Sequence, residues 1–252
     1  KGDVLYEAVE SGAYHVNVWP VCERFPCTRE EFRGAWEDRF TYDFVLAQYE
    51  KAVLEGSLSS FNQELMLRIS ADEERLVQDS EMRWYSRAAL LQNKSRFNFY
   101  ITTDFSTRAK QHNDFSVISV WAYNANGDWF WVDGICAKQL MNQTVNDLFR
   151  LVSAYRPQAV GVEISGQQGA FIQWLQNEMM SRNIWFSFAQ GKNGEPGIRP
   201  ETDKLARFNR VTPLFKAGKI YLPQEMRASR VLGELVQELQ LATIGGLKSK
   251  HD

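Results

Sequence analysis

The sequence predicts an α/β protein, in which a mixed β-sheet is flanked by helices and preceded by a mainly helical N-terminal segment. The first observation behind this prediction is a change of pattern near residue 95. Helical periodicity dominates before it, and strand-like runs alternate with helical periodicity after it. The second is a hydrophobic content of 44%, which is enough for a full core. No stretch approaches the roughly 20 apolar residues of a membrane span.

The N-terminal part begins with a strand-like piece over residues 14–20 and continues as helices. Glu31 follows Thr28 at capping-box spacing, and apolar residues over 32–40 recur with helical periodicity, so a helix is predicted there. The later elements of this part are a second helix over 42–56, a short element from Ser59 to Glu64, and a strand or loop followed by a helix over 72–93.

The C-terminal part begins with three strands and then alternates helices with strands. Asn126-Gly127 is a strong hairpin signal between the second and third strands. Pro157 ends the first long helix, and Gly218 ends the third. The predicted elements are strands over 97–103, 115–121 and 129–135, then helix 143–155, strand 159–164, helix 169–182, strand 184–189, helix 201–217, strand 219–222 and helix 227–241.

Three antiparallel strands followed by helix, strand, helix, strand and helix are the element order of a ribonuclease H-like fold. A doubly wound nucleotide-binding sheet would instead alternate from its start and carry a glycine-rich first turn. The sequence has neither a Gly-x-Gly-x-x-Gly motif nor a Walker A motif. We therefore expect a ribonuclease H-like sheet over residues 96–252.

Charge and cysteine content narrow the class of protein. The net charge is −2, which argues against a passive, charge-driven binder of nucleic acid. Cys22, Cys27 and Cys136 are an odd number and show neither a zinc pattern nor a disulfide framework, so a reducing cytoplasm is expected. The chain opens at Lys1 rather than at Met, and we expect a fragment or a processed product.

Two acidic residues lie where hydrophobic strands end. Asp104 follows the first strand of the C-terminal part, and Glu163 follows the apolar run 159–162. Asp104 alone also suits a turn or cap, but a Glu is rarely buried without a partner. The two strands are adjacent in the predicted sheet, so both carboxylates would lie at one edge. A divalent cation would compensate them, and the usual chemistry of such a site is phosphodiester cleavage or transfer.

Further polar residues accompany the two acids. Asp114 precedes the second strand and is either a loop acid or part of the metal site. Lys204 and Arg207 lie one turn apart on a predicted helix, where they would face a phosphate backbone or form a solvated surface. The loop from Lys192 to Arg199 is basic enough to contact DNA.

These segments together resemble the nuclease end of the large terminase subunit of tailed bacteriophages. The resemblance covers roughly residue 60 to the end and rests on the order and spacing of its motifs. The matching segments are Phe61-Asn62-Gln63-Glu64, Thr103-Asp104-Phe105-Ser106 with Asp114, Val162-Glu163-Ile164-Ser165-Gly166, Asp203-Lys204 with Arg207, residues 214–221, and His251-Asp252.

The resemblance implies a two-metal-ion endonuclease that cuts concatemeric viral double-stranded DNA during genome packaging in the host cytoplasm. Its cofactors would be two Mg²⁺ or Mn²⁺ ions, and its partners the DNA, the portal protein and the small terminase subunit. The implied metal ligands are Asp104, Glu163, Asp252 and Asp114. The family's third acid lies in a His-Asp-Asp type segment, so it is either Asp252 or the next residue. Lys204 would be catalytic, and the implied DNA contacts are Lys192, Arg199, Lys204 and Arg207.

The resemblance also implies a division of the chain. Residues 1–26 would be a remnant of the end of the packaging ATPase domain, 27–95 a helical linker subdomain, and 96–252 the nuclease domain, with the ATPase itself absent. Two other interpretations remain open. One is another ribonuclease H-like nuclease, such as a junction resolvase or a transposase. The other is a non-catalytic docking module of a packaging motor, whose acids are vestigial.

Overall fold

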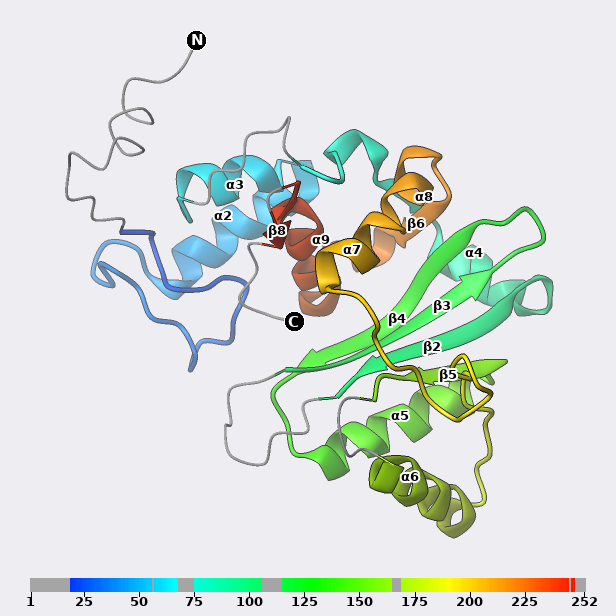
Figure 1. Cartoon of the computed structure of the whole chain (residues 1–252). Helices are drawn as coiled ribbons and strands as arrows, with labels where there is room; N and C mark the ends of the chain where they lie inside the picture. The colour runs from blue at the N-terminus through cyan, green and yellow to red at the C-terminus, as the bar shows by residue number, and fades with distance from the viewer. Residues whose placement is uncertain are drawn as a thin grey trace. The chain divides into compact units, whose positions relative to one another are not determined.

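The computed structural model describes residues 19–55, 57–67, 75–105, 115–164, 169–244 and 246–247. The chain forms two compact units, residues 1–70 and 71–252, and each is described by itself (Figure 1). The boundary predicted after residue 95 falls inside the second unit. Within the described ranges, no helix is long and apolar enough to cross a membrane.

The first unit packs two helices, α2 (Tyr42–Glu55) and α3 (Leu58–Glu64), around an aromatic core. Phe25 is fully buried in this core, and its ring centroid lies 5.3 Å from that of Tyr49 and 6.1 Å from that of Phe61. The rings of Tyr49 and Phe61 are themselves 5.5 Å apart, so the three rings form a closed cluster. The second predicted helix and the short element after it are confirmed.

The helix predicted downstream of Thr28 is wrong. Glu31 accepts a hydrogen bond from the backbone N–H of Thr28 at 3.2 Å, as a capping box requires. The residues that follow form turns, and Gly34 makes an antiparallel bridge with Cys22. The backbone around Gly34 thus pairs with a distant segment, and these groups are not available to a helical ladder.

The second unit is built on a mixed sheet whose strand order is β1-β6-β4-β3-β2-β5. Strands β2, β3 and β4 are antiparallel neighbours. Strand β5 is parallel to β2, β6 is parallel to β4, and β1 is parallel to β6. The strands are β1 (Arg83–Tyr85), β2 (Asn98–Asp104), β3 (Ser116–Tyr123), β4 (Trp129–Ala137), β5 (Ala159–Val162) and β6 (Ile220–Pro223). This topology confirms the predicted ribonuclease H-like mixed sheet.

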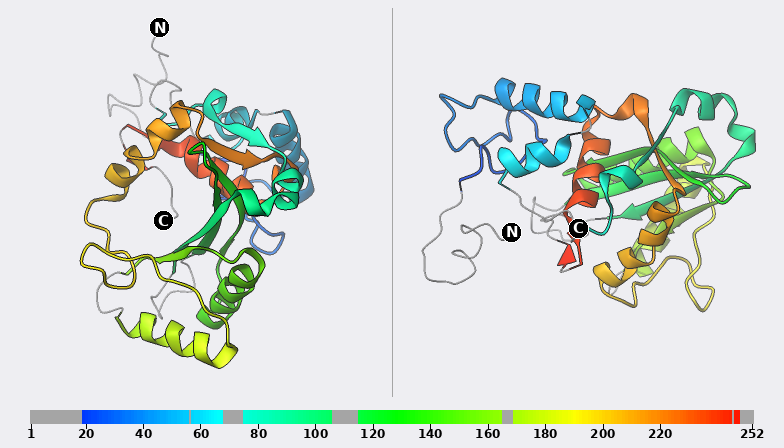
Figure 2. Two further views of the ribbon diagram at one scale, coloured as in Figure 1. Left: turned by 90° about the vertical axis from the view of Figure 1, so that its right-hand side faces the viewer. Right: turned by 90° about the horizontal axis from the view of Figure 1, so that it is seen from above.

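Helices cover both faces of this sheet. Helices α5 and α6 lie on one side and α9 on the other (Figures 1 and 2). The helices of this unit are α4 (Arg87–Gln92), α5 (Met141–Tyr155), α6 (Gly169–Arg182), α7 (Lys204–Asn209), α8 (Thr212–Lys216) and α9 (Arg230–Leu241). Three short 3-10 turns (Asp79–Glu81, Lys94–Arg96 and Gln224–Met226) and a small pair of strands, β7 (Ala242–Thr243) and β8 (Gly246–Leu247), complete the described elements.

The core between the sheet and α5 follows directly from sequence periodicity. Alternate residues of β3, including Ile118 and Val120, are fully buried, as a strand with one face inward requires. On α5, Val145 and Leu148 are also fully buried, at the helical spacing that predicted this helix. These side chains belong to one continuous core cluster, which also includes residues of β2 and β5 and holds these two strands against α5.

Two predicted elements differ from the structure. The strand expected over 184–189 forms a single parallel bridge, between Phe188 and Val160 of β5. The helix expected over 201–217 is divided into α7 and α8. Pro213 explains the division, because its ring clashes with the carbonyl four residues earlier, at Asn209, where α7 ends.

Candidate metal centre at the ends of β2 and β5

Asp104 and Glu163 are brought together by the register of two parallel strands. Thr103 of β2 lies opposite Val162 of β5, so the next residue on each strand is one of the two acids. Neighbouring strands are about 4.8 Å apart, which places the two carboxylates side by side at one edge of the sheet. Both residues are half-buried. The predicted adjacency of their strands is confirmed.

The chain around Asp104 is anchored on both sides. The hydroxyl of Thr103 is buried and donates to the carbonyl of Gly161 at 3.2 Å, which ties β2 to β5 just before the acids. Phe105 turns back into the core, where its ring packs edge-on against Phe171 with centroids 5.1 Å apart. Asp104 is therefore held at a fixed point of the sheet edge, between two buried neighbours.

A loop segment extends the sheet beside Glu163. Ile198 forms a parallel bridge with Glu163; its N–H donates to the carbonyl of Val162 at 2.8 Å, and its carbonyl accepts the N–H of Ile164 at 2.8 Å. Gly197 makes the close approach possible, because a Cβ at this position would lie 2.0 Å from Cδ1 of Ile164. This segment leads the chain into α7.

Helix α7 places a cation on one of the two acids. Nη1 of Arg207 donates to Oε2 of Glu163 at 2.9 Å, and the two side chains are 34% and 29% exposed. The helix begins where Asp203 caps it by accepting the N–H of Ala206 at 2.9 Å. Of the two basic residues that the sequence singled out on this helix, Arg207 makes this contact. The described part of the centre thus contains two carboxylates and one guanidinium.

Of the other predicted site residues, two lie outside the described residues and two lie in the loop ahead of α7. Asp114 and Asp252 lie outside the described residues. Lys192 forms an exposed ion pair with Glu201, which joins the two ends of the loop ahead of α7. Arg199 is exposed in the same loop. Within the described ranges, no group of three or more His, Cys, Asp or Glu side chains could hold a metal ion, so any third carboxylate would come from outside them.

The ion pair between Glu163 and Arg207 was not predicted from the sequence, which assigned Arg207 to DNA. One signal could have suggested it. A half-buried Glu needs a compensating cation, and an arginine of the chain can serve as well as a metal. The choice of arginine requires the fold, because the pair joins residues brought together by the loop at Ile198.

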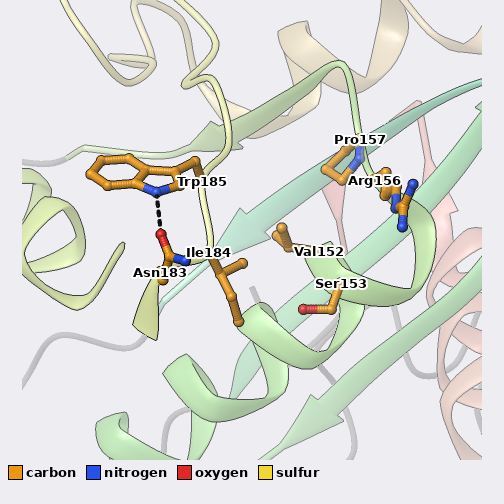
Figure 3. Close-up of a pocket in the computed structure, with 7 residues that line it drawn as sticks. All are labelled: Val152, Ser153, Arg156, Pro157, Asn183, Ile184 and Trp185. Atoms are coloured by element: carbon orange, nitrogen blue, oxygen red, sulfur yellow. Dashed lines mark hydrogen bonds between the residues drawn. The ribbon is translucent and has the colours of Figure 1, made fainter. Parts of the chain in front are cut away.

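A pocket of about 480 Å³ lies at the opposite end of β5 (Figure 3). Pro157 precedes β5 and Glu163 follows it, so at about 3.3 Å per residue the pocket is roughly 20 Å from the acids. The indole of Trp185 is 63% exposed there, and its Nε1 donates to Oδ1 of Asn183 at 3.3 Å. The lining residues are Val152, Ser153, Arg156, Pro157, Asn183, Ile184 and Trp185. This pocket is not part of the candidate metal centre.

The fold and the paired acids together define a ribonuclease H-like α/β domain with carboxylates at one sheet edge. No protein-family model and no curated protein matches the chain. Solved structures do show similarity. The human cytomegalovirus terminase nuclease domain is 15% identical, with a TM-score of 0.44 over 62% of this chain and 79% of that chain.

Two bacteriophage proteins show the same kind of similarity. The large terminase nuclease from thermophilic phage G20c, solved with bound magnesium, is 16% identical, with a TM-score of 0.37 over 60% of this chain and 69% of that chain. The HK97 bacteriophage large terminase is 13% identical, with a TM-score of 0.32 over 86% of this chain and 49% of that chain. The chain is thus similar to terminase nucleases.

Proposed function

We propose that this chain is a metal-dependent endonuclease acting on viral double-stranded DNA, the nuclease part of a terminase large subunit. The observation that carries the proposal is the strand register that sets Asp104 beside Glu163. Two adjacent half-buried carboxylates strongly favour a cationic partner. Arg207 supplies one positive charge to Glu163, and a divalent cation at this edge would supply two more.

The donor set fits a hard divalent cation. Carboxylate oxygens are the ligands that Mg²⁺ and Mn²⁺ prefer over soft sulfur or imidazole sites. Asp104 and Glu163 would hold the metal, with Asp252 and Asp114 as the further proposed ligands and two ions per site. When bound, such metals activate water and stabilise the leaving oxygen of a phosphodiester.

The basic residues of this edge would bind the DNA backbone. Arg207 already lies at Glu163, and Lys204 is one turn before it on α7, so both would balance the charge that grows on the phosphate. Lys192 and Arg199 belong to the exposed loop ahead of this helix and would contact neighbouring phosphates. Phosphate contacts carry no sequence information, so cleavage would be weakly sequence-specific.

We propose the wider role of the chain from the resemblance of its sequence to the large terminase subunit. The DNA would be a concatemer cut to genome length in the host cytoplasm, with the portal protein and the small terminase subunit as partners. Residues 1–26 would be the end of an ATPase domain and residues 27–95 the linker between that motor and the nuclease over 96–252.

Plasmid digestion tests the proposal. The chain should cut plasmid DNA with Mg²⁺ or Mn²⁺ and not with EDTA, and Asp104→Asn or Glu163→Gln should reduce the rate by at least about 100-fold. Asp147→Asn is the matched control, because this carboxylate lies on α5 and bonds only to neighbouring side chains in the described structure. Cleavage that survives Asp104→Asn would refute the metal assignment. A strong preference for four-way junctions, cut symmetrically, would favour a resolvase instead.

A further inference from the structure

The guanidinium of Arg207 is hydrogen-bonded to a carboxylate oxygen of Glu163, and a metal held by Glu163 would compete for the same carboxylate. The contact joins Nη1 to Oε2 of Glu163 at 2.9 Å. A divalent cation bound by Glu163 would therefore meet a positive charge already in place. Two cations within a few ångströms repel each other, most strongly where solvent is partly excluded.

The position of Arg207 is built into the fold. The parallel bridge between Ile198 and Glu163 fixes the loop to β5, and the ion pair of Lys192 with Glu201 joins the loop's two ends. Asp203 then starts α7 with its side-chain cap, which sets Arg207 over Glu163. An arginine on a free surface would have no such series of constraints.

The contact is nevertheless incomplete. Nε of Arg207 is buried and has no hydrogen-bond partner among the described residues. A strong arginine–carboxylate pair is commonly bidentate, with two parallel hydrogen bonds. In the described structure this pair has one hydrogen bond, and both side chains are partly exposed. Its guanidinium can therefore be exchanged at modest cost, and a DNA phosphate would satisfy more of its donors.

Resting on the proposed function, we propose that Arg207 is an exchangeable counter-ion of Glu163. It neutralises the carboxylate in competition with the divalent cation, and so lowers the affinity of the site for metal. A DNA phosphate that takes over the guanidinium leaves Glu163 to the metal. Because linkage is reciprocal, DNA should tighten metal binding by the same factor by which metal tightens DNA binding. Arg207 is thus a positioning residue that couples substrate to cofactor.

A Mn²⁺ titration of the whole chain without DNA, read from the electron paramagnetic resonance signal of the free ion, tests this proposal. Arg207→Gln should bind Mn²⁺ about threefold to tenfold more tightly than the wild type, because it removes a nearby positive charge. Arg207→Lys keeps the charge and should stay within about twofold of the wild type. Arg210→Gln, an exposed arginine three positions further on, is the matched control and should not change the affinity.

The second readout is the same Mn²⁺ titration in the presence of a short DNA duplex. The duplex has a non-hydrolysable backbone, and Ca²⁺ is excluded from the buffer. DNA should tighten Mn²⁺ binding by the wild type, and Arg207→Gln should lose part of this gain. Unchanged or weaker Mn²⁺ binding by a folded Arg207→Gln, with circular dichroism as the check, would overturn the counter-ion role. A wild type that binds no Mn²⁺ at all would instead refute the proposed function itself, so the two failures are distinguishable.

Discussion

Gly197 lies so close to Ile164 that any side chain at its position would force one of the two residues to shift. A Cβ would lie 2.0 Å from Cδ1 of Ile164, and the backbone φ of Gly197 is +93°, in the region that L side chains avoid. The contact seats the loop against β5, next to the bridge between Ile198 and Glu163. Gly197 thus allows the segment that leads to α7 to pack against β5.

Gly197→Ala should therefore destabilise the second unit by about 2–4 kcal/mol, through overpacking and backbone strain together. Gly194→Ala is the matched control. Its φ is +79°, but a Cβ there meets nothing within 4 Å, so only strain of about 1 kcal/mol is expected. Urea denaturation of both variants measures the difference, and equal losses at the two positions would show that the packing against Ile164 is unimportant.

Glu225 caps helix α4 from a distant part of the chain. Its Oε2 accepts the N–H of Arg87 at 2.9 Å, and its Oε1 accepts the hydroxyl of Ser86 at 2.8 Å. The bond from the Arg87 N–H is the largest cause that lowers the pKa of Glu225, which falls from 4.5 to about 2. A carboxylate with a depressed folded pKa stabilises the protein above its unfolded pKa, and this contribution is lost as pH falls through the folded value.

Glu225→Gln should therefore cost about 0.5–1 kcal/mol at pH 7, as the loss of a charged cap does. The difference from the wild type should shrink between pH 4.5 and about 2, the interval between the unfolded and folded pKa values. Urea unfolding of both proteins at pH 7, 4 and 3 measures it. A difference that stays constant over this range would contradict the capping role.

The strands that carry the site were predictable because their periodicity and their burial agree. In β2 every second residue from Phe99 to Thr103 is buried, and the apolar run of β5 is buried from Val160 to Val162. An inward face on β2 and a largely buried β5 leave few sheet arrangements. Asp104 and Glu163 could therefore be placed at one edge from the sequence alone, although their roles could not.

The failures have a different physical origin. The alternating apolar pattern that predicted a strand over 184–189 does reflect burial. Its apolar side chains, those of Ile184, Phe186 and Phe188, pack against the core. Their backbone meets β5 only around Val160, at the margin of the sheet, and a strand requires more paired residues than that. The pairing of Arg207 with Glu163 is likewise decided by distant backbone contacts, which no local pattern records.

Lys204 should contribute one phosphate contact to DNA binding. Lys204→Gln should weaken binding to unrelated duplexes by the same factor and make the negative slope of log K against log salt shallower by about 0.9. Lys51→Gln, which removes an exposed lysine of α2, is the control and should leave the slope unchanged. Fluorescence anisotropy over a salt series measures both. A loss confined to one DNA sequence would contradict a contact with the backbone.

Asp104 should bind metal, so Mn²⁺ should stabilise the wild type more than it stabilises Asp104→Asn. In EDTA the two proteins should differ by no more than about 1 kcal/mol, because the substitution keeps the shape of the side chain at the half-buried end of β2. In Mn²⁺ at ten times its dissociation constant, the wild type should gain about 1.4 kcal/mol through mass action, whereas the variant should gain little. Thermal unfolding in EDTA and in Mn²⁺ measures the gain of each protein. An equal gain by both proteins would show that Asp104 is no metal ligand.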